Sequence, residues 1–170
     1  MFHHPISLVY YAPAWLSKAV LLVKFSNSWQ QIPKDTKYLF IHVPKTGGSS
    51  LAKALYGGYI NHVSVKIHYL LDQERFARMI VFAIIRHPAE RFLSSINHCL
   101  GKSSRASKDD IELGKRLLKF GDDAISIAES LCISPASIVR YCGVSVLFVP
   151  QYHWLCIGKK GGGVNSFYMA

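Results

Sequence analysis

The chain has 170 residues, of which 50 % are apolar and 18 % are charged. This composition excludes a wholly disordered chain or a coiled coil, and the length predicts one domain with its own hydrophobic core. Lys and Arg number 20 against 10 Asp and Glu, which gives a net charge of +10. Such a charge favours an anionic partner: a phosphate, a sulfate, an acidic glycan, a nucleic acid or a membrane surface.

The N-terminal residues 6–23 are apolar enough to raise the question of a membrane span. Pro13 and Lys18 interrupt this stretch, no Lys or Arg precedes it, and no small-residue cleavage site follows it. We therefore expect a helix over about 14–25 that packs on the domain, and a cytoplasmic protein. Membrane association, as through a Golgi-type anchor, is the alternative.

A polar stretch, residues 27–37, separates the N-terminal part from the rest of the chain. It is typical of a connector that leads into a first strand. We therefore divide the chain into an N-terminal helical or apolar segment with its connector, residues 1–37, and a single domain, residues 38–170.

Two units in the domain have the order strand, loop, helix. The apolar runs 38–43 and 79–85 predict buried parallel strands. A helix over 49–56, capped by a serine, follows the first run, and a helix from Pro88 to about Leu100 follows the second. This alternation predicts an α/β fold with a mainly parallel sheet flanked by helices. The other expected elements are a helical stretch over 63–79 that breaks at Asp72, two helices within 109–132 around Gly121, and a strand at 145–149.

Neither the cysteines nor the histidines are spaced like metal ligands. No CxxC pair is present, and none of the eight histidines belongs to an HxxxH or HExxH pattern. We expect no metal site, and we expect buried free thiols at Cys99, Cys132, Cys142 and Cys156.

The loop after the first expected strand, residues 44–50 (PKTGGSS), is typical of an anion-binding site. Two glycines allow successive backbone N–H groups to face one concavity, and the helix that follows adds the unpaired donors of its first turn. The lysine precedes the glycines, so the loop differs from the GxxxxGK[ST] pattern of nucleoside triphosphatases. The side chains and backbone of six residues are available to an anion: Lys45, Thr46, Gly47, Gly48, Ser49 and Ser50.

Residues 40–50, FIHVPKTGGSS, resemble the 5′-phosphosulfate-binding loop of sulfotransferases that use 3′-phosphoadenosine 5′-phosphosulfate (PAPS). The likeness is closest to the carbohydrate (heparan 2-O-type) and bacterial branch, whose loop is PKTGG[ST]S. The resemblance implies a P-loop-like three-layer fold, with PAPS as co-substrate and 3′-phosphoadenosine 5′-phosphate (PAP) as product. It also implies an acceptor hydroxyl on a glycan or small molecule.

The same family has a second anion site, formed by an arginine after a strand and a serine eight residues later. Arg86 and Ser94 fit that pattern directly after the second apolar run. Arg86 offers a planar fork for the 3′-phosphate. Ser94 lies six residues beyond Pro88, about 9 Å along a helix. Arg91 shares the face of Ser94, as a third contact, a partner of Glu90 or a solvated side chain.

Sulfo transfer to a hydroxyl is an in-line displacement that needs a base and positive charge at the leaving phosphate. Lys45 is expected to supply the charge. The carbohydrate branch has its base in an HxS-type segment, and residues 61–67 (NHVSVKI) match it at His62. A histidine imidazole with its ordinary pKa is mostly unprotonated at pH 7 and can therefore accept a proton. His68 is the second candidate, and His42, within the first expected strand, is expected to lie in the core.

The resemblance weakens towards the C-terminus. It continues faintly at residues 148–151 (FVPQ), a motif that precedes a helix in the family. Residues 159–163 (KKGGG) predict a hairpin turn before a last strand or, alternatively, a loop around the 3′-phosphate. The short C-terminal part indicates a minimal or truncated member. The competing functions are a catalytically inactive protein that binds PAP or PAPS and, with less support, a P-loop-type nucleotide kinase. Nucleic-acid binding is the least supported.

Overall fold

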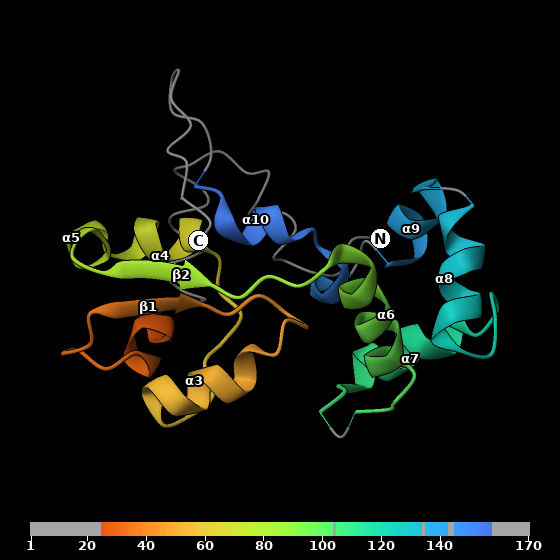
Figure 1. The fold of residues 1–170 in the computed structure, drawn as a ribbon, viewed down its shortest axis with the longest axis horizontal. Coiled ribbons are helices and arrows are strands. Elements are labelled where there is room, and N and C mark those ends of the chain that lie inside the picture. Colours follow the sequence, from red (N-terminus) through yellow and green to blue (C-terminus); the bar gives the residue numbers. More distant parts are fainter. Residues whose placement is uncertain (1–24, 104, 134, 143–144, 158–170) are drawn as a thin grey trace, which may run out of the picture.

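A computed structural model describes residues 25–103, 105–133, 135–142 and 145–157 (Figure 1). The apolar stretch 6–23 and the loop at 159–163 lie outside these residues. Within the described ranges, no helix has the length and apolar character needed to cross a bilayer.

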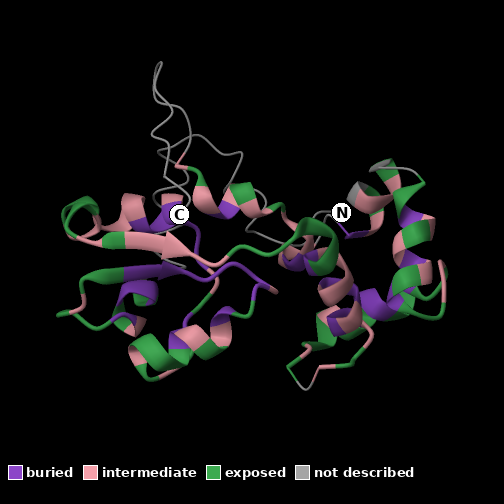
Figure 2. Ribbon diagram, in the orientation of Figure 1, coloured by how far each residue is buried: buried purple, intermediate pink, exposed green. Residues whose placement is uncertain are grey.

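Two parallel strands form the sheet in the described part of the chain. β1 (Tyr38–Ile41) pairs with β2 (Ile80–Ala83), and Tyr38 lies opposite Ile80. Both predicted strands are therefore confirmed, although each is shorter than its apolar run. β1 is buried after its first residue, whereas β2 is partly exposed along its length (Figure 2).

The connection between the strands contains the helices α3 (Gly48–Tyr56), α4 (Val65–Leu71) and α5 (Gln73–Ala77). Asp72 separates α4 from α5, as predicted, and its carboxylate accepts a hydrogen bond from the backbone N–H of Arg75. This bond caps α5 and ends the preceding helix.

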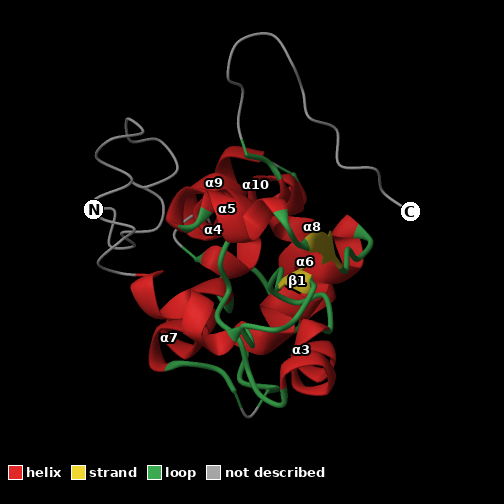
Figure 3. Ribbon diagram, turned by 90° about the vertical axis from the view of Figure 1, so that its left-hand side faces the viewer, coloured by secondary structure: helices red, strands yellow, loops and turns green. Residues whose placement is uncertain are grey.

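Helices cover both faces of the sheet. Figure 1 shows α3 on one side and α4 with α10 (Gln151–Leu155) on the other, and the turned view in Figure 3 agrees. Side chains that alternate along β1 divide between two clusters. Leu39 and Ile41 pack with Trp29 and Trp154, whereas Phe40 packs beside α3. The structure is thus a mixed α/β domain with a small parallel sheet and flanking helices.

A second group of helices packs beside the sheet and builds the other half of the molecule (Figure 1). It contains α6 (Pro88–Cys99), α7 (Lys108–Leu117), α8 (Ala124–Cys132) and α9 (Pro135–Cys142). Their apolar faces meet around Ile96, Leu117 and Leu131. Gly114 allows α7 to approach α6 closely, because a Cβ atom there would clash with the backbone of Cys99. The first three helices were predicted, and α9 was not.

Two local predictions were wrong. Residues 145–149 do not form a strand: Val146–Phe148 is a 3₁₀ helix, η2, which the Ser145 side chain begins by accepting a hydrogen bond from the N–H of Leu147. The polar stretch before β1 is not a simple connector either. It contains a second 3₁₀ helix, η1 (Ser26–Gln31), and its Trp29 is buried in the core.

All four cysteines are free thiols, as expected, but only two of them are buried. Cys99 and Cys142 lie in the helical core, where burial raises the pKa of each thiol, to about 12 and about 11. Cys132 and Cys156 are exposed, against the prediction.

Candidate functional site

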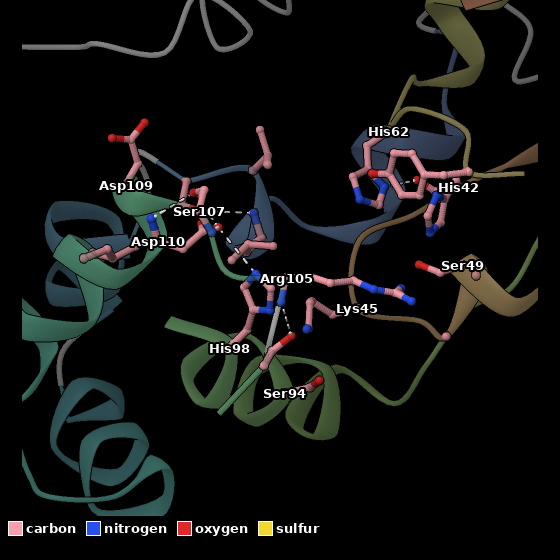
Figure 4. A pocket seen from close by; sticks show the side chains of 18 of the residues that line it. His42, Lys45, Ser49, His62, Ser94, His98, Arg105, Ser107, Asp109 and Asp110 are labelled. Atoms are coloured by element: carbon pink, nitrogen blue, oxygen red, sulfur yellow. Dashed lines mark hydrogen bonds and ion pairs between the residues drawn. The ribbon is translucent and has the colours of Figure 1, made fainter. Parts of the chain in front are cut away.

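A cleft of about 810 Å³ lies between the sheet and the helical group, and the loops that follow β1 and β2 both open into it (Figure 4). Its volume is in the range of small-molecule and cofactor sites. Eight of the nine residues predicted for the site line this one cleft. They are Lys45, Gly47, Gly48, Ser49, Ser50, His62, Arg86 and Ser94.

The loop after β1 has a backbone shape that needs its glycines. Gly47 is the N-cap of α3 at φ +83°, so the helix begins at Gly48, and the expected serine cap is wrong. Gly48 packs directly on a ring: a Cβ atom there would lie 2.5 Å from Cδ2 of His42 and 2.8 Å from Cζ of Phe40. Both glycines line the cleft, so the N-terminus of α3, with the unpaired N–H groups of a helix start, lies at its wall.

Lys45 has the strained left-handed conformation, with φ of 66°. Such a conformation costs about 1 kcal/mol or more in a residue other than glycine. Its half-buried ammonium group lines the cleft, and burial lowers its pKa. Asp110 acts in the opposite direction, and Arg86 lowers the pKa further. The loop thus holds a cation beside a second cation, an arrangement that favours a bound anion.

Thr46 is the one predicted site residue that does not line the cleft. It is buried, and its hydroxyl donates a hydrogen bond of 3.0 Å to the main-chain oxygen of Val43. The side chain therefore closes the loop on itself and does not face the cleft, so Thr46 could contact an anion there only through its backbone.

Arg91 also holds the loop in place. The guanidinium is buried and donates to the main-chain oxygen of Pro44 at 2.9 Å through Nε and to that of Leu147 at 3.0 Å. The sequence left open whether Arg91 is solvated or pairs with Glu90, and in the structure it does neither. It ties α6 to both the anion loop and η2.

Arg86 follows β2, and its backbone is fixed by a side chain distant in sequence. The Gln151 amide accepts from the N–H of Arg86 at 3.0 Å and donates to its carbonyl at 2.8 Å. Gln151 belongs to the FVPQ motif, and α10 begins there as predicted. The guanidinium is 40 % exposed and contacts Glu90 at 3.2 Å through Nε. An exposed ion pair of this kind is weak, so it leaves the arginine available to a phosphate.

His62 lies against the segment that follows β1. Its Nδ1 is 2.8 Å from the main-chain oxygen of His42. Because a carbonyl oxygen only accepts, Nδ1 is the protonated nitrogen and Nε2 has the free lone pair. Burial, with His42 next, lowers the pKa of His62 to about 4, so the ring is neutral at pH 7.

The second candidate base, His68, lies elsewhere. It is 4 % exposed, its ring packs edge-on against Trp29 at 5.0 Å, and it does not line the cleft. Of the two candidate bases, the geometry therefore favours His62.

The opposite wall of the cleft was not predicted. It comes from the start of α7, from the segment before it and from the end of α6. There His98 lies 3.4 Å from Asp110, whose carboxylate also caps α7 through Ser107 (Figure 4). The sequence signals the start of α7 by its capping residues, but not which face it turns to the cleft. The cleft-lining residues that the sequence did not identify, on this wall and elsewhere, are His42, Tyr59, His98, Ser103, Arg105, Ser107, Asp109, Asp110, Glu112, Leu113, Arg116, Ser145, Val146 and Leu147.

Within the described residues, no group of three His, Cys, Asp or Glu side chains is arranged to hold a metal ion. Comparison with known proteins gives no family: no family model, no curated protein and no solved structure matches the chain.

Proposed function

We propose that the protein is a sulfotransferase that takes the sulfo group of PAPS and transfers it to an acceptor hydroxyl, of a carbohydrate or of another small polar molecule. One observation supports this above the others: the lysine-containing loop and the Arg86–Ser94 pair line the same cleft. A nucleotide with phosphates at both the 3′ and 5′ positions needs two such anion sites within one pocket.

The residues of the cleft fit such a nucleotide. The first turn of α3 and the hydroxyls of Ser49 and Ser50 suit the 5′ end, because helix N-termini bind phosphates and sulfates. Arg86 and Ser94 suit the 3′-phosphate, since a guanidinium pairs with phosphate through two parallel hydrogen bonds. This assignment agrees with the sequence resemblance at residues 40–50 and 86–94. The further support is that residues of both segments line a single cleft.

The proposed reaction is an in-line displacement at sulfur. PAPS supplies an activated sulfo group, whose bond to the 5′-phosphate oxygen breaks as the acceptor oxygen bonds to sulfur. Lys45 neutralises the charge that develops on the leaving phosphate. His62 accepts the acceptor proton at Nε2, because its Nδ1 is already protonated and donates to His42. The residues assigned to the reaction act without a metal ion.

The proposal is tested by transfer of radiolabelled sulfo groups from PAPS across a panel of sugar and small hydroxyl acceptors. Binding of PAP is measured in parallel by calorimetry. We expect Lys45→Ala and Arg86→Ala each to weaken PAP binding by about 10- to 100-fold, the value of a charge-assisted contact. His62→Ala is expected to leave PAP binding within about 3-fold and to reduce transfer by about 100-fold or more.

Two substitutions control for the loss of positive charge. Lys53 is an exposed residue of α3 and Arg78 an exposed residue before β2, and neither lines the cleft. Lys53→Ala and Arg78→Ala should therefore leave PAP binding unchanged. Binding of PAP without transfer to any acceptor would indicate the inactive nucleotide-binding protein instead. Tighter binding of ATP than of PAP would indicate a kinase-type site.

A further inference from the structure

His42 is a buried polar residue to which the proposed reaction assigns no part. It follows β1, is 3 % exposed, and its ring stacks on Phe40 with centroids 5.8 Å apart. Its Nδ1 lies 3.2 Å from the main-chain oxygen of Ile60, so Nδ1 is protonated and Nε2 is not. Burial lowers its pKa, which keeps the ring neutral.

The ring of His42 is confined on two further sides. Gly48 of the anion loop lies against it, at a distance that leaves no room for a Cβ atom. On another side the ring of His62 has its centroid 4.1 Å away, at an angle of 45°. The same residue also binds His62 through its backbone, since the His42 carbonyl accepts the Nδ1 proton of His62. His42 therefore contacts both the anion loop and the candidate base.

We propose that His42 is a positioning residue: its imidazole, held between Gly48 and His62 and bonded to Ile60, fixes the orientation of the His62 ring and so keeps Nδ1 of His62 on the His42 carbonyl. The role of His62 as a base rests on the proposed function, whereas the orientation and the tautomer of its ring do not. Without the His42 ring, His62 gains space to turn, and the bond from its Nδ1 to the His42 carbonyl is no longer enforced.

The charged and titratable groups that face His62 all oppose its protonation or are neutral. Lys45 in the anion loop and Arg91 on α6 lower its pKa, as does His42. Tyr59, after α3, faces it edge-on with ring centroids 6.1 Å apart. Removing the His42 ring therefore removes both burial and a neighbour that lowers the pKa, and the His62 pKa should rise.

The test is imidazole ¹⁵N NMR of the full chain, which reports the tautomer and the pKa of each histidine. His42→Asn keeps an N–H donor for the Ile60 carbonyl and removes the ring. We expect the pKa of His62 to rise from about 4 by at least one pH unit towards its ordinary 6.5, and its spectrum to become that of mixed tautomers. The matched control is His68→Asn, which removes another buried histidine with a pKa of about 4 outside the cleft. It should leave the His62 signals unchanged.

An unchanged pKa and tautomer of His62 in folded His42→Asn would overturn the inference. If that variant does not fold, the wild-type spectrum decides. Protonated Nδ1 in both His42 and His62 supports the inference, and protonated Nε2 in either one overturns it. In transfer assays, His42→Asn should lower kcat about 10-fold with KM for PAPS within about 3-fold. A wild-type protein that transfers no sulfo group would refute the proposed function, while the NMR result would still decide the role of His42.

Discussion

Gly48→Ala tests whether the anion loop and the candidate base form one packed unit. In an ordinary helix this substitution stabilises by about 1 kcal/mol, because alanine has the higher helix propensity. Here the new methyl group would lie 2.5 Å from the His42 ring and 2.8 Å from the Phe40 ring. Both rings are almost fully buried, so neither moves aside freely.

Overpacking of this kind costs about 1–3 kcal/mol. Contacts of 2.5 and 2.8 Å with two buried rings place this site in the upper part of that range, at about 2–3 kcal/mol. After the gain of about 1 kcal/mol in propensity, we therefore expect Gly48→Ala to lower the free energy of unfolding in urea by about 1–2 kcal/mol. The matched control is Gly58→Ala, where a Cβ atom meets nothing within 4 Å and should change stability by less than about 0.5 kcal/mol. In a double-mutant cycle, His42→Ala should relieve the clash, with a coupling of at least about 1 kcal/mol. Equal stability of Gly48→Ala and Gly58→Ala would refute the packing argument.

Further predictions concern pH, the loop and metal ions. The acidic limb of kcat/KM for sulfo transfer should lie near pH 4, where His62 titrates, and a limb near 6.5 would contradict the assigned environment. His68 has a pKa of about 4 when folded and 6.5 when unfolded, so protons bind the unfolded chain first as pH falls. The difference of about 2.5 between the two pKa values corresponds to about 3 kcal/mol of unfolding free energy, lost as the pH falls from 6.5 to 4. In urea titrations across this pH range, the stability of His68→Leu should therefore decline less steeply than that of the wild type. Thr46→Val should cost about 1 kcal/mol in unfolding free energy and leave PAP affinity within about 3-fold by calorimetry, whereas a loss of 10-fold or more would show that the Thr46 hydroxyl binds the nucleotide. Sulfo transfer should proceed at the same rate in EDTA, and a rate restored by added Mg²⁺ would contradict the assigned chemistry.

The elements predicted correctly are those whose signal is local. The apolar runs of β1 and β2, the break at Asp72 and the start of α6 at Pro88 each depend on a few neighbouring residues. η2 was mistaken for a strand because residues 146–149 are all apolar and include two valines, whereas the backbone there is held by distant groups. The carbonyl of Leu147, for example, accepts from the buried guanidinium of Arg91, 56 residues away.

The site divides in the same way. Lys45, Arg86 and His62 could be expected in one cleft because each belongs to a short motif near the end of a strand or in a loop. The contribution of His42 could not be expected, because it depends on Gly48, Ile60 and His62 meeting in space. Similarly, the α7 wall enters the cleft only because Gly114 brings α7 against α6. Short motifs predict which residues line the cleft, whereas contacts between distant segments, such as those of His42, emerge only from packing.

The most direct test of the nucleotide site is diffraction from crystals of the protein with PAP. The assignment predicts one PAP molecule in the cleft, with its 5′-phosphate on the first turn of α3 beside Lys45 and its 3′-phosphate between Arg86 and Ser94. PAP bound outside the cleft, or bound there with its 3′-phosphate away from Arg86, would contradict it.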